Sequence, residues 1–219
     1  MKKYLLLFVL FLLPFSVNAE KLKVYQRDEI FCNDRDYCAD ENKKPVTGMV
    51  ETRKNGKREN SIEYKKGFMN GKRIQYTPDG KYPLIMFTVI DGNVDGIVKA
   101  YWSDTHTVRI EKIWHKGNSV GKGVRYYKNG KKQLTISNDA KEFKFFDRKG
   151  QLFAVLNYSE GLGCYKNDKK VKTVTDKQKL LKLKDYFEEQ DKIFLGNDEQ
   201  TLMNYLLSTK EDDFRYLCE

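Results

Sequence analysis

The chain has 219 residues and a formal net charge of +10 at pH 7, from 41 lysines and arginines against 31 aspartates and glutamates. A basic surface suits an acidic protein partner or an anionic membrane surface, and lysine-rich strand faces also keep an elongated sheet soluble. The sequence has no arginine-rich stripe, recognition helix or RNA-binding signature. Nucleic acid is therefore excluded as the expected partner.

The first 19 residues have the pattern of a signal peptide. Lys2 and Lys3 precede an apolar run over residues 4–13, and small residues stand before a cleavage position after Ala19. The apolar run is too short to span a bilayer. We expect the mature chain, residues 20–219, to be exported, with the periplasm as the expected compartment and secretion as the alternative.

Four cysteines stand in the chain: Cys32, Cys38, Cys164 and Cys218. An even number of cysteines in an exported protein predicts disulfide bonds. Three pairings are open, and the short loop favours a bridge between Cys32 and Cys38, which leaves Cys164 to pair with Cys218. Neither histidine lies near a cysteine in sequence, and the spacing matches no zinc pattern, so we expect no metal and no cofactor.

A skeleton of glycine, tyrosine and turn residues recurs every 25 residues in the middle of the chain. The recurring positions are Gly67, Gly92 and Gly117; Gly71, Gly96 and Gly121; Tyr76, Tyr101 and Tyr126, here called the tyrosine column; and Asp79, Asp104 and Asn129. A fixed period of this length is the signature of stacked supersecondary units. Residues 47–163 are therefore predicted to form about five repeated β-hairpins, in a mainly β fold built on one elongated antiparallel sheet.

Turn dipeptides mark the predicted hairpins. Asn55-Gly56, Asp79-Gly80 and Asn129-Gly130 suit the positive φ angles of a type I′ turn, and Lys149-Gly150 serves the fifth unit. Asp104-Thr105 stands at the same place in the third unit without the glycine. This difference predicts a looser or longer turn there.

Alternation within the strands predicts one buried face. In the fourth unit, Val124 and Tyr126 fall on one face and oppose Arg125 and Tyr127 on the other. The tyrosine column then has two interpretations. It is either a core ladder, in which each aromatic neighbour stabilises strand pairing by roughly 0.2 to 1 kcal/mol, or an exposed aromatic strip for a partner.

The segments on either side of the repeats differ from them in pattern. Residues 20–46 are predicted to cap the first repeat. Residues 164–219 change to a helical period, with a capping box at residues 175–178 and a second helix expected after Gly196. We expect this C-terminal helical segment to cover an end of the sheet and protect it from edge-to-edge pairing. An amphipathic helix lying on a membrane is the alternative, and its mixed charge favours packing on the sheet.

The pattern Gly-x4-Tyr-x2-Asx-Gly-Lys, seen over residues 71–81 and 121–131, resembles the MORN-variant repeats of bacterial YwqK-family antitoxin-like proteins. The resemblance implies an elongated antiparallel sheet of successive hairpins. It also implies a role in binding or neutralising another protein, and related MORN repeats are associated with membrane or protein contacts. It supplies no catalytic residue.

Binding residues are expected where one unit departs from the others. The third unit gathers aromatic and basic side chains of the kind that form binding hot spots: Trp102, His106, Arg109, Trp114 and His115. An acid–base pair of His106 with Asp104 lacks a nucleophile or third group, so we expect no catalytic residues.

The sequence thus predicts an exported, non-enzymatic repeat protein that binds another protein, in an immunity or antitoxin-like role. An envelope-associated structural or membrane-surface binding protein is the alternative, and a hydrolase-type enzyme is the third.

Overall fold

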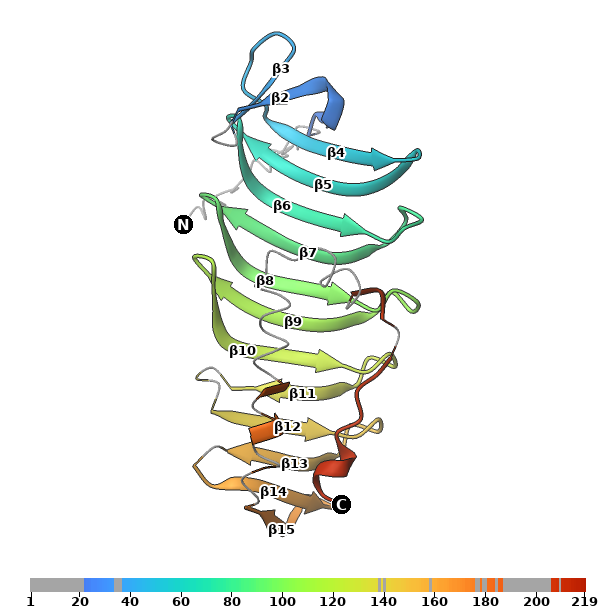
Figure 1. Cartoon of the computed structure of the whole chain (residues 1–219), viewed down its shortest axis with the longest axis vertical. Helices are drawn as coiled ribbons and strands as arrows, with labels where there is room; N and C mark the ends of the chain where they lie inside the picture. Colours follow the sequence, from blue (N-terminus) through green and yellow to red (C-terminus); the bar gives the residue numbers. More distant parts are fainter. Residues whose placement is uncertain are drawn as a thin grey trace, which may run out of the picture.

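The computed structural model describes residues 22–33, 37–137, 139, 141–157, 159–175, 178, 181–183, 185–186, 206–208 and 210–219. Thirteen strands form one long sheet in the order β1-β4-β5-β6-β7-β8-β9-β10-β11-β12-β13-β14-β15 (Figure 1). Neighbouring strands are antiparallel except for β1 and β4, which pair in parallel. The expected mainly β fold, an elongated sheet of successive hairpins, is confirmed.

The strands of the long sheet are β1 (Val24–Gln26), β4 (Gly48–Lys54), β5 (Lys57–Lys65), β6 (Phe68–Tyr76), β7 (Pro83–Ile90), β8 (Asn93–Tyr101), β9 (Val108–His115), β10 (Asn118–Tyr126), β11 (Lys132–Ile136), β12 (Glu142–Phe146), β13 (Leu152–Asn157), β14 (Gly161–Lys166) and β15 (Lys169–Val174). Two further strands, β2 (Ile30–Cys32) and β3 (Cys38–Asp40), form a small hairpin at the N-terminal end. Two short 3-10 helices are η1 (Arg27–Glu29) and η2 (Arg215–Leu217).

The predicted turns all lie between successive strands. At the β4–β5 turn, Asn55 and Gly56 have φ angles of 52° and 75°, as a type I′ turn requires. The third unit departs from the others as expected. Its turn closes with the His106 N–H donating to the Trp102 carbonyl four residues back, whereas the Gly80 N–H donates to the carbonyl three residues back. The hydrogen-bonded turn without its glycine is therefore one residue wider, which confirms the looser turn. The connection between the strands, residues 102–107, is no longer than residues 77–82 in the second unit.

A β-bulge recurs near the start of the second strand of each central hairpin. In β9, Ile110 pairs with Ala100 and Val108 pairs with Tyr101, so Arg109 is the extra residue. The same shift makes Leu84 the extra residue in β7 and Gln133 the extra residue in β11. A bulge brings two consecutive side chains to one face, and the bulge residue and its successor are buried in all three strands.

A row of directly paired residues crosses twelve of the strands and defines one face of the sheet. From β4 to β15 this row is Thr52, Asn60, Gln75, Ile85, Ala100, Ile110, Arg125, Leu134, Phe145, Ala154, Cys164 and Lys172. The row is polar at its start and apolar over most of its middle.

The buried face of the fourth unit is the one that carries Arg125 and Tyr127, a choice that the alternation of the sequence left open. Arg125 and Tyr127 are buried, whereas Val124 and Tyr126 are only half-buried. The physical reason is that the C-terminal segment covers the face that carries Arg125. Sequence alternation separates two faces but does not say which one another segment will cover.

The sheet continues past residue 163, where the helical segment was expected to begin. β14 and β15 form a further hairpin, and its two-residue turn at Asn167 and Asp168 has φ angles of 51° and 60°. The expected boundary was wrong because this turn has no glycine to mark it. Asn and Asp tolerate positive φ without one.

Helical conformation is present at the described residues 178, 181–183, 185–186 and 206–207. The rest of the expected helical segment, including Gly196 and the start of the second helix, lies outside the described residues. Leu183, Phe214 and Leu217 pack with strand residues in one core cluster, and Leu206 packs in another. The described part of the C-terminal segment therefore covers a face of the sheet and not its end, which corrects the expectation.

The N-terminal cap and both disulfides are in place. Ile30, Cys38 and Val46 pack against Val50 of the first hairpin. Cys32 is bonded to Cys38, and Cys164 to Cys218. The expected signal peptide over residues 1–19 lies outside the described residues. Over the part of the chain that the structure describes, no helix is long and apolar enough to cross a membrane.

Candidate functional site: the C-terminal strap and an adjoining cleft

The described residues 206–208 and 210–219, here called the strap, run across the strands near the hairpin turns, from β8 down to β14 (Figure 1). The side chains of the sheet hold its backbone. Ser103 Oγ donates to the Leu207 carbonyl at 3.2 Å, and Arg109 Nη1 donates to the Ser208 carbonyl at 3.1 Å. One hairpin further on, Gln133 Nε2 donates to the Asp212 carbonyl at 2.6 Å. Two of these three donors are the bulge residues, so the repeated bulge positions the groups that bind the strap.

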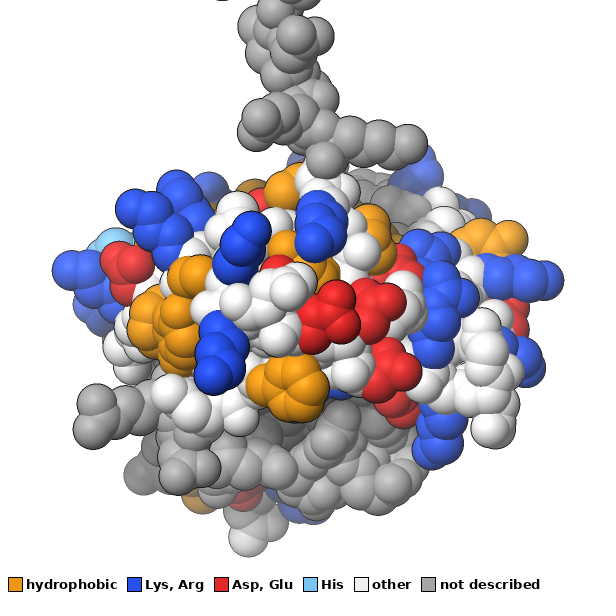
Figure 2. All heavy atoms as spheres, turned by 90° about the horizontal axis from the view of Figure 1, so that it is seen from above, with side chains coloured by type: hydrophobic (Ala, Val, Ile, Leu, Met, Phe, Trp, Pro, Cys, Tyr) orange, Lys and Arg blue, Asp and Glu red, His pale blue; other side chains and the backbone are white. Residues whose placement is uncertain are grey.

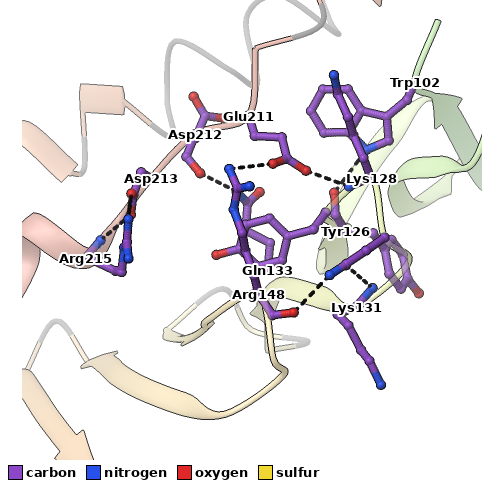
Figure 3. A network of polar contacts seen from close by, with 12 residues as sticks. Trp102, Tyr126, Lys128, Lys131, Gln133, Arg148, Glu211, Asp212, Asp213 and Arg215 are labelled. Carbon is purple, nitrogen blue, oxygen red and sulfur yellow. Dashed lines mark hydrogen bonds and ion pairs between the residues drawn. The ribbon is translucent and has the colours of Figure 1, made fainter. Parts of the chain in front are cut away.

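Acidic side chains of the strap meet basic groups of the sheet (Figure 3). Glu211 accepts from the Lys128 backbone N–H at 2.7 Å and pairs with Arg148 at 2.7 Å. Asp213 binds Arg215 within the strap, and this contact lowers the pKa of its carboxyl to about 2. The strap is therefore bound by charge as well as by backbone hydrogen bonds.

Arg125 is a buried cation that pairs with a carboxylate of the strap, and 7% of the residue is exposed. Its Nη2 pairs with Asp212 Oδ2 at 2.7 Å, and its Nη1 donates to the Tyr186 hydroxyl at 2.7 Å. The Tyr186 hydroxyl in turn donates to Asp212 Oδ2 at 2.8 Å, and burial raises the pKa of Tyr186 above its ordinary value. This triad ties β10, the helical residues and the strap together.

The five expected hot-spot residues do not form one exposed surface. Trp102, Arg109 and Trp114 are buried, with 2%, 3% and 6% of each residue exposed. The Arg109 guanidinium lies 4.3 Å from the Trp102 ring centroid, and Trp114 belongs to the core cluster that includes Leu206. These three residues support the protein's own C-terminal segment, so they are not accessible to a partner in this structure.

The two histidines lie at opposite ends of β9 and its turn. His106 is half-buried and stacks on Tyr82, with ring centroids 3.6 Å apart. His115 is exposed and lies 3.3 Å from Asp95. The Asp104 carboxylate binds Lys128, which lowers the pKa of Asp104. The aspartate considered as an acid–base partner for His106 is thus engaged with another unit.

The tyrosine column lies on the face opposite the strap. Its members are half-buried, and Tyr76 and Tyr126 hydrogen-bond within the sheet. The Tyr126 hydroxyl donates to Glu111 Oε2 at 2.9 Å, and burial together with this bond raises the pKa of Tyr126 to about 12. The Tyr76 hydroxyl lies 3.1 Å from Ser61 Oγ. Such contacts join neighbouring strands, as expected of residues that stabilise the sheet.

A cleft of about 730 Å³ opens beside the start of the strap, and sequence reasoning did not predict it. Its lining residues are Lys54, Asn55, Lys57, Arg58, Glu59, Gln75, Tyr76, Thr77, Pro78 and Leu207. The sheet contributes the first two hairpins, and the strap contributes Leu207. Seen from the N-terminal end, basic side chains gather on both flanks of the molecule, where the strand connections lie (Figure 2).

The cleft carries two lysines in direct opposition. Lys54 and Lys57 are exposed and are paired with each other across the β4–β5 hairpin. Neither lysine forms an ion pair with another described residue. Like charges directly opposite in an antiparallel pair are unfavourable. Over the same described residues, no group of three or more His, Cys, Asp or Glu is placed to hold a metal ion.

Comparisons with known proteins found no sequence match and one solved structure of low similarity. No protein-family model matches the chain, and no curated protein matches its sequence. One solved structure, the crystal structure of a GtfA/B complex bound to UDP and GlcNAc, is similar at a TM-score of 0.19 and 13% identity. The match covers 68% of this chain and 28% of the other. At that score the likeness carries no argument about fold or function.

Proposed function

We propose that this protein is an exported, non-catalytic repeat protein that binds another protein on the face of the sheet that carries the strap. One observation carries the proposal. This face already holds an extended acidic segment, by sheet side chains that bind both its backbone carbonyls and its carboxylates. A surface that binds one extended chain in this way is chemically suited to bind a second in the cleft beside it.

The compartment and the class of partner follow from other features. Two disulfides fit an oxidising environment, outside the cell or in the periplasm, and we place the protein in the periplasm because of its expected signal peptide. The resemblance of the repeats to YwqK-family antitoxin-like proteins supports an immunity-like role, in which the partner is a toxin that this protein neutralises.

Site-specific photo-cross-linking in the exporting cell tests the proposal. A photo-reactive amino acid at Lys57, in the cleft, should give one dominant protein adduct. The same amino acid at Lys122, which is exposed on β10 and does not line the cleft, is the matched control and should give none. Equal adducts at both positions, or adducts at neither, would contradict binding on this face.

An anionic membrane surface is the second candidate, favoured by the three exposed lysines of the edge strand β15: Lys169, Lys170 and Lys172. Such lysines also protect an edge strand from pairing with another chain. Salt-dependent sedimentation with phosphatidylglycerol vesicles, without a protein adduct at Lys57, would favour this candidate.

A further inference from the structure

We infer that the cleft between the first two hairpins binds an extended acidic segment of the protein partner, in line with the strap. The inference rests on the proposed function and deepens it, because it names the chemistry of the segment that is recognised. Three observations lead to it: the position of the cleft, the side chains at its base and its charge.

The cleft lies on the same track as the strap. The strap meets Ser103 and Arg109 through residues 207 and 208, and it meets Gln133 one hairpin further on through residue 212. Leu207, at the start of this track, lines the cleft together with residues of the two preceding hairpins. A segment bound in the cleft would therefore continue the strap's direction across the strands and contact Leu207, which is 37% exposed.

The side chains at the base of the cleft explain why there is space in it. Strand register places Lys54, Thr77, Trp102 and Tyr127 at equivalent positions, each two residues after its strand's member of the paired row. Beneath the strap this position holds a large buried ring, Trp102 or Tyr127. In the cleft it holds the small side chain of Thr77 or the flexible one of Lys54. The missing ring leaves room for side chains of a bound segment.

The charge of the cleft selects an acidic segment. Within the strap interface, carboxylates bind cationic groups of the sheet, as Asp212 does with Arg125 and Glu211 with Arg148. In the cleft, Lys54 and Lys57 stand opposite each other. A carboxylate placed between them would relieve their mutual repulsion and gain two charge-assisted hydrogen bonds.

Glu59 completes the resemblance to the strap's own site. It is the extra residue of the bulge in β5, since Asn60 pairs with Thr52 and Arg58 pairs with Arg53. It therefore occupies the position that Arg109 and Gln133 use to hold the strap. A carboxylate there accepts hydrogen bonds, so it would bind backbone N–H groups of the segment where the other bulge residues bind carbonyls.

The test uses a fluorescein-labelled peptide with the sequence of residues 210–217, because this sequence is known to fit the track. A second peptide replaces its glutamate and aspartates by glutamine and asparagine. Fluorescence anisotropy with the full, oxidised chain should show saturable binding of the acidic peptide. The amide peptide should bind at least about tenfold more weakly, because it loses its charge-assisted hydrogen bonds.

Matched variants locate the binding. Lys54→Glu with Lys57→Glu should weaken binding of the acidic peptide at least about tenfold, and Lys54→Gln with Lys57→Gln should act in the same direction. Lys122→Glu with Lys132→Glu makes the same change of charge at exposed positions away from the cleft and should leave binding unchanged. Because all four lysines are exposed, each variant is expected to melt like the unmodified chain.

Equal binding of the two peptides, or equal loss in the cleft and control variants, would overturn the inference. So would binding of phosphatidylglycerol vesicles that the cleft variants abolish while peptide binding is undetectable. A protein adduct at Lys57 without acidic-peptide binding would overturn this inference and leave the proposed function standing. Peptide binding without any protein adduct in the cell would contradict the proposed function. The preference of the cleft for an acidic segment would still stand.

Discussion

The strap-covered hairpins and the first two hairpins share one backbone design and differ in the side chains of one face. Where the strap lies, the paired row holds Ala100, Ile110 and Leu134, all buried. Near the N-terminal end the same row holds Thr52 and Asn60, both half-buried. The repeat therefore keeps the same turns and bulges in each unit. The side chains on the face differ between units that the strap covers and units that it leaves uncovered.

The largest expected effect separates the two disulfides. The Cys164–Cys218 bridge closes 54 residues and fixes the strap, whereas the Cys32–Cys38 bridge closes 6 residues in the cap. Chain-entropy arguments predict a loss of about 4 kcal/mol for Cys164→Ser with Cys218→Ser. For Cys32→Ser with Cys38→Ser the predicted loss is about 2 kcal/mol. Urea unfolding followed by circular dichroism measures both, and an equal or reversed order would contradict the strap's role.

The buried cation that pairs with a strap carboxylate comes next. Arg125→Met should lower the free energy of unfolding by about 2 to 3 kcal/mol, because Asp212 and Tyr186 lose a charged partner. Lys99→Met is the control, since Lys99 pairs with Glu111 on the opposite face and about a third of each side chain is exposed. That change should cost about 1 kcal/mol or less. Similar losses in the two variants would show that the strap face has no special role.

A smaller effect is expected at the bulge in β11. Gln133 is 2% exposed and donates to the Asp212 carbonyl. Gln133→Leu leaves that carbonyl without this donor and should cost about 1 to 2 kcal/mol. Gln151→Leu, at an exposed position, should stay within about 0.5 kcal/mol. Thermal melting of the two variants compares them, and an unchanged Gln133→Leu protein would mean that the bulge donor is dispensable.

The smallest effect is the dependence on acid. Hydrogen bonds from Lys128 and Arg215 lower the pKa values of Asp104 and Asp213, the latter to about 2. A carboxyl whose pKa is lowered by folding adds stability above its unfolded pKa of about 4, and this stability is lost as the pH falls through the folded value. Both groups are largely exposed, so solvent screening keeps the contribution small. Asp213→Asn should flatten the loss of stability between about pH 4 and pH 2, measured by urea unfolding; an unchanged slope would assign the acid dependence elsewhere.

The turns and the hairpin order were predictable because they depend on local chemistry. Asn-Gly and Asp-Gly pairs require positive φ at fixed positions, and their spacing carries the repeat. The pairing of the cysteines followed the loop length that favoured Cys32 with Cys38. The β14–β15 turn was missed because Asn167 and Asp168 adopt positive φ without a glycine.

The covered face and the cleft depend on contacts between residues far apart in sequence. Nothing local shows that Arg125 will hold Asp212 or that Arg109 will hold Ser208. The third unit, which contains Arg109, was therefore interpreted as a surface for a partner. One signal was present in the sequence. Thr77 stands 25 residues before Trp102 and 50 before Tyr127, and this loss of an aromatic ring marks the unit where the cleft opens.

Hydrogen-exchange mass spectrometry of the oxidised chain, with and without the acidic peptide, tests most directly whether the two parts of this face have separate roles. Binding in the cleft should slow amide exchange in residues 52–60 and 75–78, and leave exchange unchanged in residues 102–109, 125–133 and the strap. Slower exchange at residues 125–133 together with faster exchange in the strap would show that the peptide displaces the strap. That result would contradict the account, because the covered hairpins would then be the binding site.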